Sequence, residues 1–511
     1  MAKSKRTTKS TLSDAPYLTV AIIAILAVIC FLPLTKYFFL QDDFALLEGA
    51  AFRPNATFSA FFDRDPGLFR PLTKAAYFAF MYKLFGLNPG PYHFVSLLLH
   101  IINIFLFFRL LRQFKIEITG ALITTSLFAM NVAFLDVIGW ICCVQQLAGM
   151  LFVLFGLSLG IRAIETKSPW ATLSALAAYI LALMCVEQTY AMPLLLFLYA
   201  YQREETKNTG VRIANAAKVS ASFLAVMIIY LAFILGWKGI PTWEPYSFHI
   251  GPNVVANLAT YLDWIFDLSV VMPFVTNVAL QGLTVNHLVI VVLAVYNLAT
   301  GRQRIVVFGL SYYLLAIFPV LLLEQHTFYL HNYVPSFGMF ILLAPVTQDL
   351  IELLRRWQPR YARVFPAVFI ALVAVMSVTG IRVNERNQFS PSIPLPKHFV
   401  LRRAVVAENA YTDIKAKVDT RRQPDQLFMV YTGPKSWYMK NVTAALANAS
   451  APRLFFKAPD MRVFFNELGD TLQTYDADNS ELLFFNNIGH CYTADEIGGA
   501  GRTATEFIEP E

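Results

Sequence analysis

The chain has 511 residues, of which 57% are hydrophobic and only 15% charged, and its mean hydropathy is +0.52. These values exclude an ordinary soluble domain and indicate a polytopic α-helical membrane protein. The formal net charge of +7 does not indicate nucleic acid as a partner. Cations of membrane proteins collect in short cytoplasmic loops, and the sequence has no basic stripe interleaved with aromatic residues.

Apolar windows predict about eleven transmembrane helices. Clusters of Lys and Arg alternate with poorly basic loops, so we expect a cytoplasmic N-terminus and, after an odd number of spans, an extracytoplasmic C-terminus. The chain is expected in a bacterial inner membrane, or in the endoplasmic reticulum membrane if its host is eukaryotic. The predicted spans are approximately 17–40, 92–112, 118–135, 137–161, 169–186, 189–202, 215–237, 286–300, 305–323, 334–353 and 365–382.

Two apolar stretches that carry charges, 68–87 and 253–272, are predicted to be helices lying along the outer membrane surface. If either one crossed the bilayer, the orientation of everything after it would be inverted. The first extracytoplasmic loop, 41–91, is long and rich in charged residues, yet too apolar to be disordered. We therefore expect it to fold onto the membrane surface.

Asp42 and Asp43 follow directly on the first predicted span. Carboxylates cost several kcal/mol in hydrocarbon, so an acidic pair at its edge is a candidate functional site. The alternative is that the two aspartates cap the start of an interfacial helix, where Asp is favoured.

Cations follow in the same loop. Arg70 and Lys74 are four residues apart and would share one face of a helix, and Arg53 and Arg64 are weaker candidates. The alternative for Arg70 and Lys74 is that they extend to lipid headgroups without a catalytic role.

Further polar residues are predicted at the same outer ends of later spans. Asp136 and Glu187 could instead cap or seal helix junctions, and the histidines and tyrosines could belong to an interfacial belt. Their joint occurrence on one face favours an interfacial enzyme acting on an amphiphile over a transporter, which would place its acids near the bilayer midplane. These candidate residues of a substrate cavity are Asp136, Glu187, Gln188, His326, Tyr329, His331 and Tyr333.

The chain divides into a membrane part, 1–390, and a small extracytoplasmic α/β domain, 391–511, because hydrophobicity drops after residue 383. Short strands are predicted at 426–431, 453–456 and 481–486. Helices are predicted at about 398–416, 434–447 and 458–468.

Several segments of the membrane part resemble the GT-C membrane glycosyltransferases, above all relatives of the protein O-mannosyltransferases, including those that modify cadherins and their bacterial cousins. The resemblance covers most of residues 1–382 and depends on the order of the segments. Asp136 and Glu187 take acidic places in it, while Asn131-Val132 replaces a His-Pro pair and Gln145-Gln146 replaces a charged pair. The segments are the aspartate pair, Arg70–Leu72, Leu84–Leu111, Leu127–Phe152, Leu183–Tyr201 and His331–Gly338.

The resemblance implies an inverting transferase that moves a sugar from a polyprenyl-phosphate donor to an acceptor hydroxyl of a protein, a lipid glycan or an envelope polymer. By the family match, Asp42 or Asp43 is the general base, with Asp42 preferred. The leaving phosphate needs fixed cations, and Arg70 and Lys74 are the first candidates.

No cofactor is expected, because relatives that use a monophosphate donor generally work without a metal, although two acids together with Asp136 could hold a divalent ion. Two other classes stay open. One is a flippase or transporter for polyprenyl-linked sugars, and the other is a non-catalytic envelope assembly protein. The sequence leaves the identity of the sugar and of the acceptor open.

Overall fold

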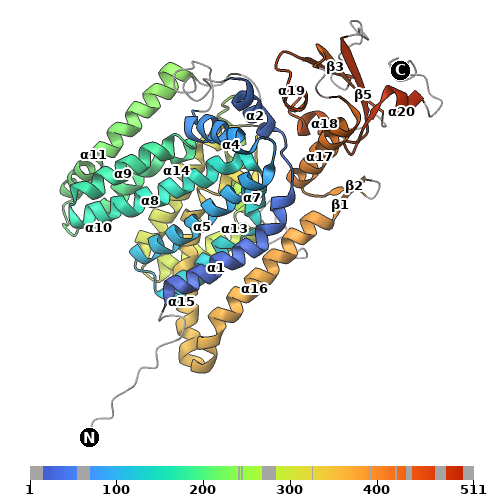
Figure 1. Cartoon of the computed structure of the whole chain (residues 1–511). Helices are drawn as coiled ribbons and strands as arrows, with labels where there is room; N and C mark the ends of the chain where they lie inside the picture. The colour runs from blue at the N-terminus through green and yellow to red at the C-terminus, as the bar shows by residue number, and fades with distance from the viewer. Residues whose placement is uncertain are drawn as a thin grey trace.

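The computed structural model of the chain is a bundle of helices with a smaller mixed part at one end (Figure 1). The structure describes residues 15–53, 69–239, 242, 246–266, 284–324, 326–390, 393–419, 423–432, 440–466 and 479–498.

The membrane part consists of helices joined by short 3₁₀ or π turns. Their ends follow ordinary capping rules: Asn88 accepts a hydrogen bond from the backbone of Gly90 at 3.2 Å, and Pro89 opens the helix that follows. The elements are α1 (Pro16–Phe31), η1 (Leu32–Lys36), α2 (Asp42–Phe52), η2 (Pro71–Ala76), α4 (Tyr77–Phe85), α5 (Pro89–Gln113), α6 (Ile118–Ala129), η3 (Val132–Phe134), α7 (Leu135–Gly139), η4 (Ile141–Cys143), α8 (Val144–Thr166), α9 (Pro169–Leu183), η5 (Glu187–Ala191), α10 (Met192–Arg203), α11 (Thr209–Phe233), η6 (Ile234–Lys238), α12 (Pro252–Trp264), α13 (Val285–Ala299), α14 (Gln303–Leu321), η8 (Tyr329–Asn332), α15 (Ser336–Trp357) and α16 (Pro359–Arg386).

The expected class, a polytopic helical membrane protein with a small C-terminal α/β part, is confirmed, whereas the count of eleven spans is not. Within the described residues, seven helices are long and apolar enough to cross a membrane, or eight if the bent pair Ile118–Ala129 and Val132–Gly139 is one span. The other three expected spans correspond to α9, α10 and α13. The 12 residues of α10 extend over about 18 Å, less than the roughly 30 Å of a hydrocarbon core.

The two stretches predicted as surface helices are mostly helical where they are described. The first forms η2 and α4, and the second forms α12, while 267–283 lies outside the described residues. In Figure 1, α2 and α4 lie together at the end of the bundle that faces the C-terminal part.

The C-terminal part is built around a sheet with the strand order β4-β3-β5-β6. Strand β3 is buried along its whole length and pairs in parallel with β4 and β5, while β6 is antiparallel to β5. Parallel pairing with both faces covered explains its continuous apolar sequence. The elements are β1 (Gln388–Ser390), β2 (Ile393–Pro396), α17 (Phe399–Lys417), β3 (Gln426–Tyr431), α18 (Lys440–Ala445), α19 (Ser450–Phe456), β4 (Arg462–Phe465), β5 (Ser480–Phe485), β6 (Cys491–Thr493) and α20 (Ala494–Gly498).

Two of the predicted elements there are wrong. The strand expected at 453–456 is the last turn of α19, which ends at Lys457 with a positive φ of 53°. The helix expected at 458–468 contains β4 instead. In both segments, packing against distant parts of the chain decides between helix and strand, because a short apolar run is compatible with either.

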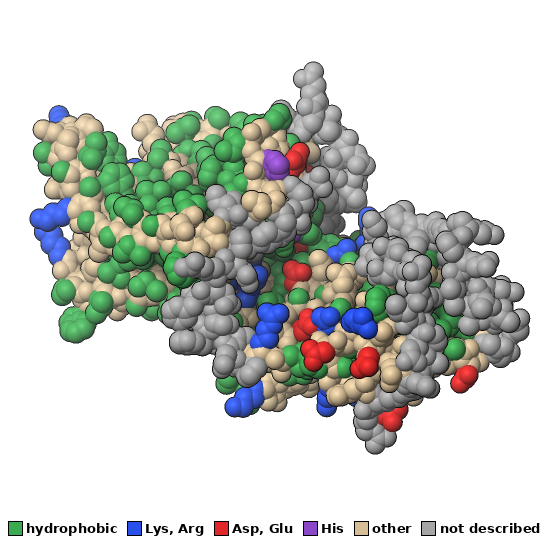
Figure 2. Space-filling model, turned by 90° about the horizontal axis from the view of Figure 1, so that it is seen from above, with side chains coloured by type: hydrophobic (Ala, Val, Ile, Leu, Met, Phe, Trp, Pro, Cys, Tyr) green, Lys and Arg blue, Asp and Glu red, His purple; other side chains and the backbone are tan. Residues whose placement is uncertain are grey.

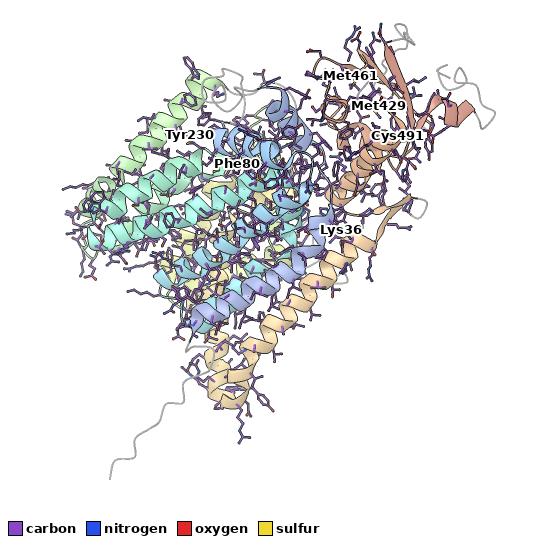
Figure 3. The ribbon with its side chains drawn as sticks, viewed as in Figure 1. Lys36, Phe80, Tyr230, Met429, Met461 and Cys491 are labelled. Atoms are coloured by element: carbon purple, nitrogen blue, oxygen red, sulfur yellow. The ribbon has the colours of Figure 1, made fainter. Side chains whose placement is uncertain are left out.

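The C-terminal part packs directly on the membrane part. Phe38 stacks on Tyr411 with ring centroids 5.0 Å apart, and Phe44 meets Phe455 edge to face at 5.7 Å. Lys36, the last residue of η1 and labelled in Figure 3, forms a 3.0 Å ion pair with Glu385 of α16. The first span and the last helix of the bundle are therefore joined where the chain enters the C-terminal part.

Candidate active site

A cavity of about 600 Å³ opens beside the start of α2 and brings together residues from widely separated segments. Figure 2 views the molecule from the end that carries α2 and the C-terminal part: basic and acidic side chains gather in the middle and lower right, while hydrophobic side chains cover much of the left. Seven of the candidate residues line this cavity: Asp42, Arg70, Lys74, Glu187, Gln188, His326 and His331.

Asp42 is the first residue of α2, and its side chain is accessible from the cavity. The preceding residue, Gln41, has a positive φ of 47°, an uncommon conformation for a residue other than glycine. Burial raises the pKa of the Asp42 carboxyl above its ordinary value, and the nearby cations Lys74, Arg70 and Arg403 partly oppose this rise. A carboxylate with a raised pKa is a stronger base, as proton transfer near neutral pH requires.

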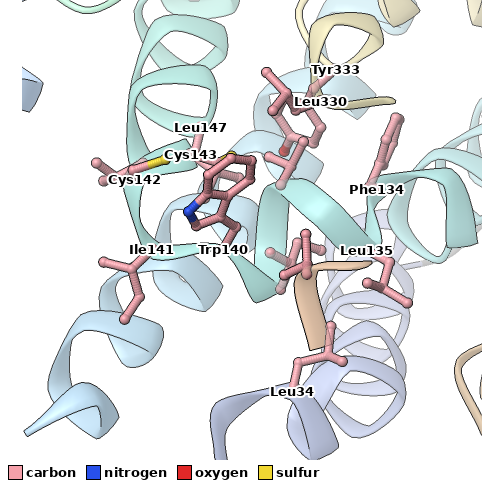
Figure 4. Close-up of a cluster of buried hydrophobic side chains, with 14 of the residues drawn as sticks. Leu34, Phe134, Leu135, Trp140, Ile141, Cys142, Cys143, Leu147, Leu330 and Tyr333 are labelled. Carbon is pink, nitrogen blue, oxygen red and sulfur yellow. The ribbon is translucent and has the colours of Figure 1, made fainter. Parts of the chain in front are cut away.

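Asp43 has a different environment from its neighbour. It is fully buried, and its carboxylate accepts hydrogen bonds from the backbone N–H groups of Leu40 at 3.1 Å and Cys142 at 2.6 Å. It does not line the cavity. Asp43 thus joins the start of α2 to the turn before α8, shown in the buried cluster of Figure 4.

Arg70 is held by two partners. Its Nη2 lies 2.7 Å and its Nε 2.9 Å from Oε2 of Glu187, and its Nη1 donates to Oε1 of Gln145 at 2.6 Å. A guanidinium has five N–H groups, so two remain available to a ligand. Although burial opposes it, the carboxylate of Glu187 contributes to raising the pKa of Arg70. The ion pair fixes the cation at the wall of the cavity.

Lys74 is the less restrained cation. No hydrogen bond or ion pair to its ammonium group is present among the described residues. Burial, followed by the positive charge of Arg70, lowers its pKa. Its backbone is fixed because Thr73 Oγ1 donates to the carbonyl of Cys185 at 3.0 Å. An anion at the cavity wall would relieve the unfavourable environment of this ammonium group.

The histidine and tyrosine candidates divide between the cavity and the core. His326 and His331 line the cavity with ring centroids 5.9 Å apart, and burial lowers the pKa of His326 to about 4, so its ring is neutral at pH 7. Tyr333 is buried instead, with its hydroxyl 2.7 Å from Nδ1 of His100. Tyr329 stacks on Trp264 at 4.2 Å. Neither tyrosine lines the cavity.

Two of the remaining candidates, Asp136 and Arg53, do not line the cavity. Asp136 is buried, with Oδ1 lying 3.0 Å from Nε2 of His398 at the start of α17. Arg53 is an exposed residue at the end of α2 and does not line the cavity, and Arg64 lies outside the described residues.

The sequence did not single out several contributors. Gln145 was visible only as a replacement for a charged residue in a motif, and Gln146 beside it lines the cavity too. Gln41 and Arg403, whose side chains are hydrogen-bonded across 362 residues of sequence, gave no local signal. No group of three or more His, Cys, Asp or Glu residues in the described part of the chain is arranged to hold a metal ion.

No family model and no curated protein matches the sequence. Among solved structures, ArnT from Cupriavidus metallidurans aligns in its apo state with a TM-score of 0.46 and 10% identity over 88% of this chain and 86% of that one. The same protein bound to undecaprenyl phosphate aligns with a TM-score of 0.47 and 10% identity over 92% of both chains. The apo oligosaccharyltransferase of Archaeoglobus fulgidus aligns with a TM-score of 0.48 and 13% identity over 89% of this chain and 65% of that one.

Each alignment spans most of this chain, so the likeness is one of fold at 10–13% sequence identity.

Proposed function

We propose that the protein is an inverting glycosyltransferase that moves a sugar from a polyprenyl-phosphate donor to an acceptor hydroxyl, with Asp42 as the general base. The observation that carries the proposal is the meeting of one accessible carboxylate, Asp42, with the cations Lys74 and Arg70 at one cavity. The reaction needs a base for the acceptor and positive charge for the leaving phosphate, and both are supplied there.

Part of the cavity lining is apolar, which suits the lipid of such a donor. An amphiphile with a phosphate head would place its head at Lys74 and its tail along the apolar part of the lining. The two free N–H groups of Arg70 would contact the same phosphate. The apolar lining comes from α11, η6, α14 and the residues after it: Leu231, Ile234, Leu235, Phe318, Pro319, Val320, Leu322 and Leu323.

The transfer follows from these positions. The acceptor hydroxyl loses its proton to the Asp42 carboxylate as its oxygen forms a bond to the anomeric carbon. The bond from that carbon to the phosphate oxygen breaks on the opposite face, and its electron pair leaves with the phosphate, where Lys74 balances the added negative charge. Attack opposite to the leaving group inverts the anomeric configuration.

We place the site on the extracytoplasmic side, with residues 391–511 as a domain beside it that contributes to acceptor selection. The support is the charge pattern of the loops and the direct packing of Phe38 on Tyr411 and of Phe44 on Phe455. The acceptor is a hydroxyl of a protein, a lipid glycan or an envelope polymer.

The two aspartates provide the test. Asp42→Asn should leave folding intact and lower transfer of a radiolabelled sugar from polyprenyl phosphate by at least about 100-fold. Asp43→Asn should instead lower thermal stability, since the buried carboxylate that accepts two backbone hydrogen bonds is replaced, while the folded fraction retains transfer. Glu352→Gln, an exposed acid on α15, is the control and should change neither.

Undiminished transfer by Asp42→Asn would overturn the assignment of the base. Movement of the labelled lipid across proteoliposomes without any transfer would favour the flippase instead.

A further inference from the structure

Seven buried side-chain atoms at the cavity have no hydrogen-bond partner among the described residues. A buried polar atom without a partner costs about 1–3 kcal/mol, and native proteins keep few of them. Their concentration at one cavity indicates that a ligand satisfies them. The atoms belong to five cavity-lining residues: Trp140 Nε1, Gln146 Oε1 and Nε2, Gln188 Oε1, Tyr230 Oη, and His331 Nδ1 and Nε2.

These side chains come from four elements and from Trp140, the residue between α7 and η4, and two of them are held in place. Gln188 is fixed because its amide nitrogen donates to the backbone carbonyl of His331 at 2.8 Å, which leaves its oxygen free. Trp140 packs edge to face against Phe399 with ring centroids 6.0 Å apart. The unpartnered atoms of Gln188 and Trp140 are therefore held in place before a ligand binds, which favours selective binding.

The chemical nature of the five groups identifies the ligand class. The indole of Trp140 donates, the free oxygen of Gln188 accepts, and Gln146, Tyr230 and neutral His331 each do both. A sugar hydroxyl is likewise both donor and acceptor, so several neighbouring hydroxyl groups match this set. The indole also gives the less polar face of a sugar ring a surface to pack on.

The same five groups carry no charge. Burial lowers the pKa of His331 well below its usual value, and the positive charge of Arg70 acts in the same direction. Arg70 is already paired with Glu187, and Asp42 faces Lys74 and Arg403. With Lys74 and Arg70 contacting the donor phosphate, as in the proposed function, an ammonium or carboxylate group among these five side chains would be buried without a counterion, which costs several kcal/mol.

We propose that Trp140, Gln146, Gln188, Tyr230 and His331 form the subsite for the transferred sugar, and that this subsite selects an uncharged, hydroxyl-rich sugar over an amino sugar or a uronic acid. The inference rests on the proposed function and adds the class of sugar to it.

The test compares purified full-length variants in lipid nanodiscs. Tyr230→Phe and Gln146→Leu should each weaken binding of a polyprenyl-phosphate hexose by about 3- to 10-fold, the value of one or two hydrogen bonds. Gln146→Leu should at the same time raise the Tm of the ligand-free protein, because it removes two unpartnered buried atoms. A merely structural role would instead lower Tm and leave the affinity of the folded protein unchanged.

Tyr312→Phe is the matched control. Tyr312 is a buried tyrosine of α14 whose hydroxyl also has no partner among the described residues, but it does not line the cavity. This variant should leave donor affinity unchanged.

A donor panel completes the experiment. Polyprenyl-phosphate amino sugar and uronic acid should bind roughly 100-fold more weakly than the hexose, and Gln146→Glu should improve binding of the amino sugar. Equal binding of all three donors, or unchanged hexose affinity in both Tyr230→Phe and Gln146→Leu, would overturn the neutral-sugar subsite while leaving the proposed function standing. If neither sugar-bearing nor sugar-free polyprenyl phosphate binds the wild-type protein, the proposed function itself fails.

Discussion

Oε1 of Glu48 on α2 lies 3.1 Å from Nη1 of Arg453 on α19, and Ser450 donates a hydrogen bond to the other oxygen of the same carboxylate at 2.6 Å. Helix α2 begins with Asp42, so this pair links the proposed base to the C-terminal part. Two charged side chains, each less than one third exposed, hold the two regions together here.

Reversing this pair should loosen the C-terminal part. Arg453→Glu places two carboxylates together, and we expect faster proteolysis of residues after 390 and a several-fold loss of transfer. Adding Glu48→Arg to this variant should restore much of the resistance to proteolysis and much of the transfer. The reason is that the ion pair is re-formed with opposite polarity. Limited proteolysis and a transfer assay check this. Glu352 and Arg355, an exposed pair on α15, are the control, and their reversal should change nothing measurable.

Glu187→Gln should destabilise the protein by about 3 kcal/mol, because it leaves the guanidinium of Arg70, 9% exposed, without its counterion. Thermal unfolding in detergent measures the loss. Glu165→Gln breaks a pair with Arg203 that is mostly exposed and should not shift Tm. Equal Tm values for both variants would contradict a structural role for the Arg70–Glu187 pair.

The pH dependence of transfer should report the carboxyl of Asp42. Burial raises its pKa, and a base works only when deprotonated, so the rate should fall as pH drops through that raised pKa. Lys74 lowers the same pKa, and Lys74→Met should therefore move the acid limb of log kcat/KM to higher pH. Lys83→Met removes an exposed cation of α4 and should leave the limb in place. If the acid limb of log kcat/KM stays at the same pH in Lys74→Met, the inference that Lys74 lowers the pKa of Asp42 is wrong.

His326→Gln should not change the pH profile of transfer between pH 5 and 8. The pKa of His326 is lowered to about 4, so its ring stays neutral across that range. A new or lost inflection near pH 6 in this variant would show that the histidine is protonated there.

Gly338→Ala should disrupt the packing of α14 against α15. A Cβ there would overlap the backbone oxygen of Gly309, and a Cβ at Gly309 would lie 2.6 Å from the oxygen of Gly338, so the two helix backbones are in direct contact. We expect a loss of about 1–3 kcal/mol of stability. Gly236→Ala, with open space around the added carbon, should be neutral or slightly stabilising.

Much of the fold could be predicted because apolar windows report where helices run. Hydropathy does not report helix length, so α10 was read as a span although it has 12 residues. The short segments of α19 and β4 carry no decisive period, and contacts with β3 and with α2 decide their structure.

The charged part of the site could also be predicted, since Asp42, Arg70, Lys74 and Glu187 are charges in apolar surroundings. The residues alone do not show that Asp42 lines the cavity while Asp43 is buried. The carboxylate of Asp43 is bound by the backbone N–H of Cys142, which is 99 residues away in the sequence. Uncharged groups such as Gln146 and Tyr230 do not stand out in an apolar chain. Their role depends on segments that meet only in the folded protein.

Gln41 is held by residues near the end of the chain: its backbone N–H donates to the carbonyl of Ala445 at 2.8 Å, and its side chain accepts from Arg403. These contacts set the direction in which α2 starts. A ribosome makes Gln41 early and Ala445 late, so the first acid of α2 cannot take its final position until nearly the whole chain has been synthesised. A prematurely terminated chain would therefore insert into the membrane without the contacts that orient the start of α2.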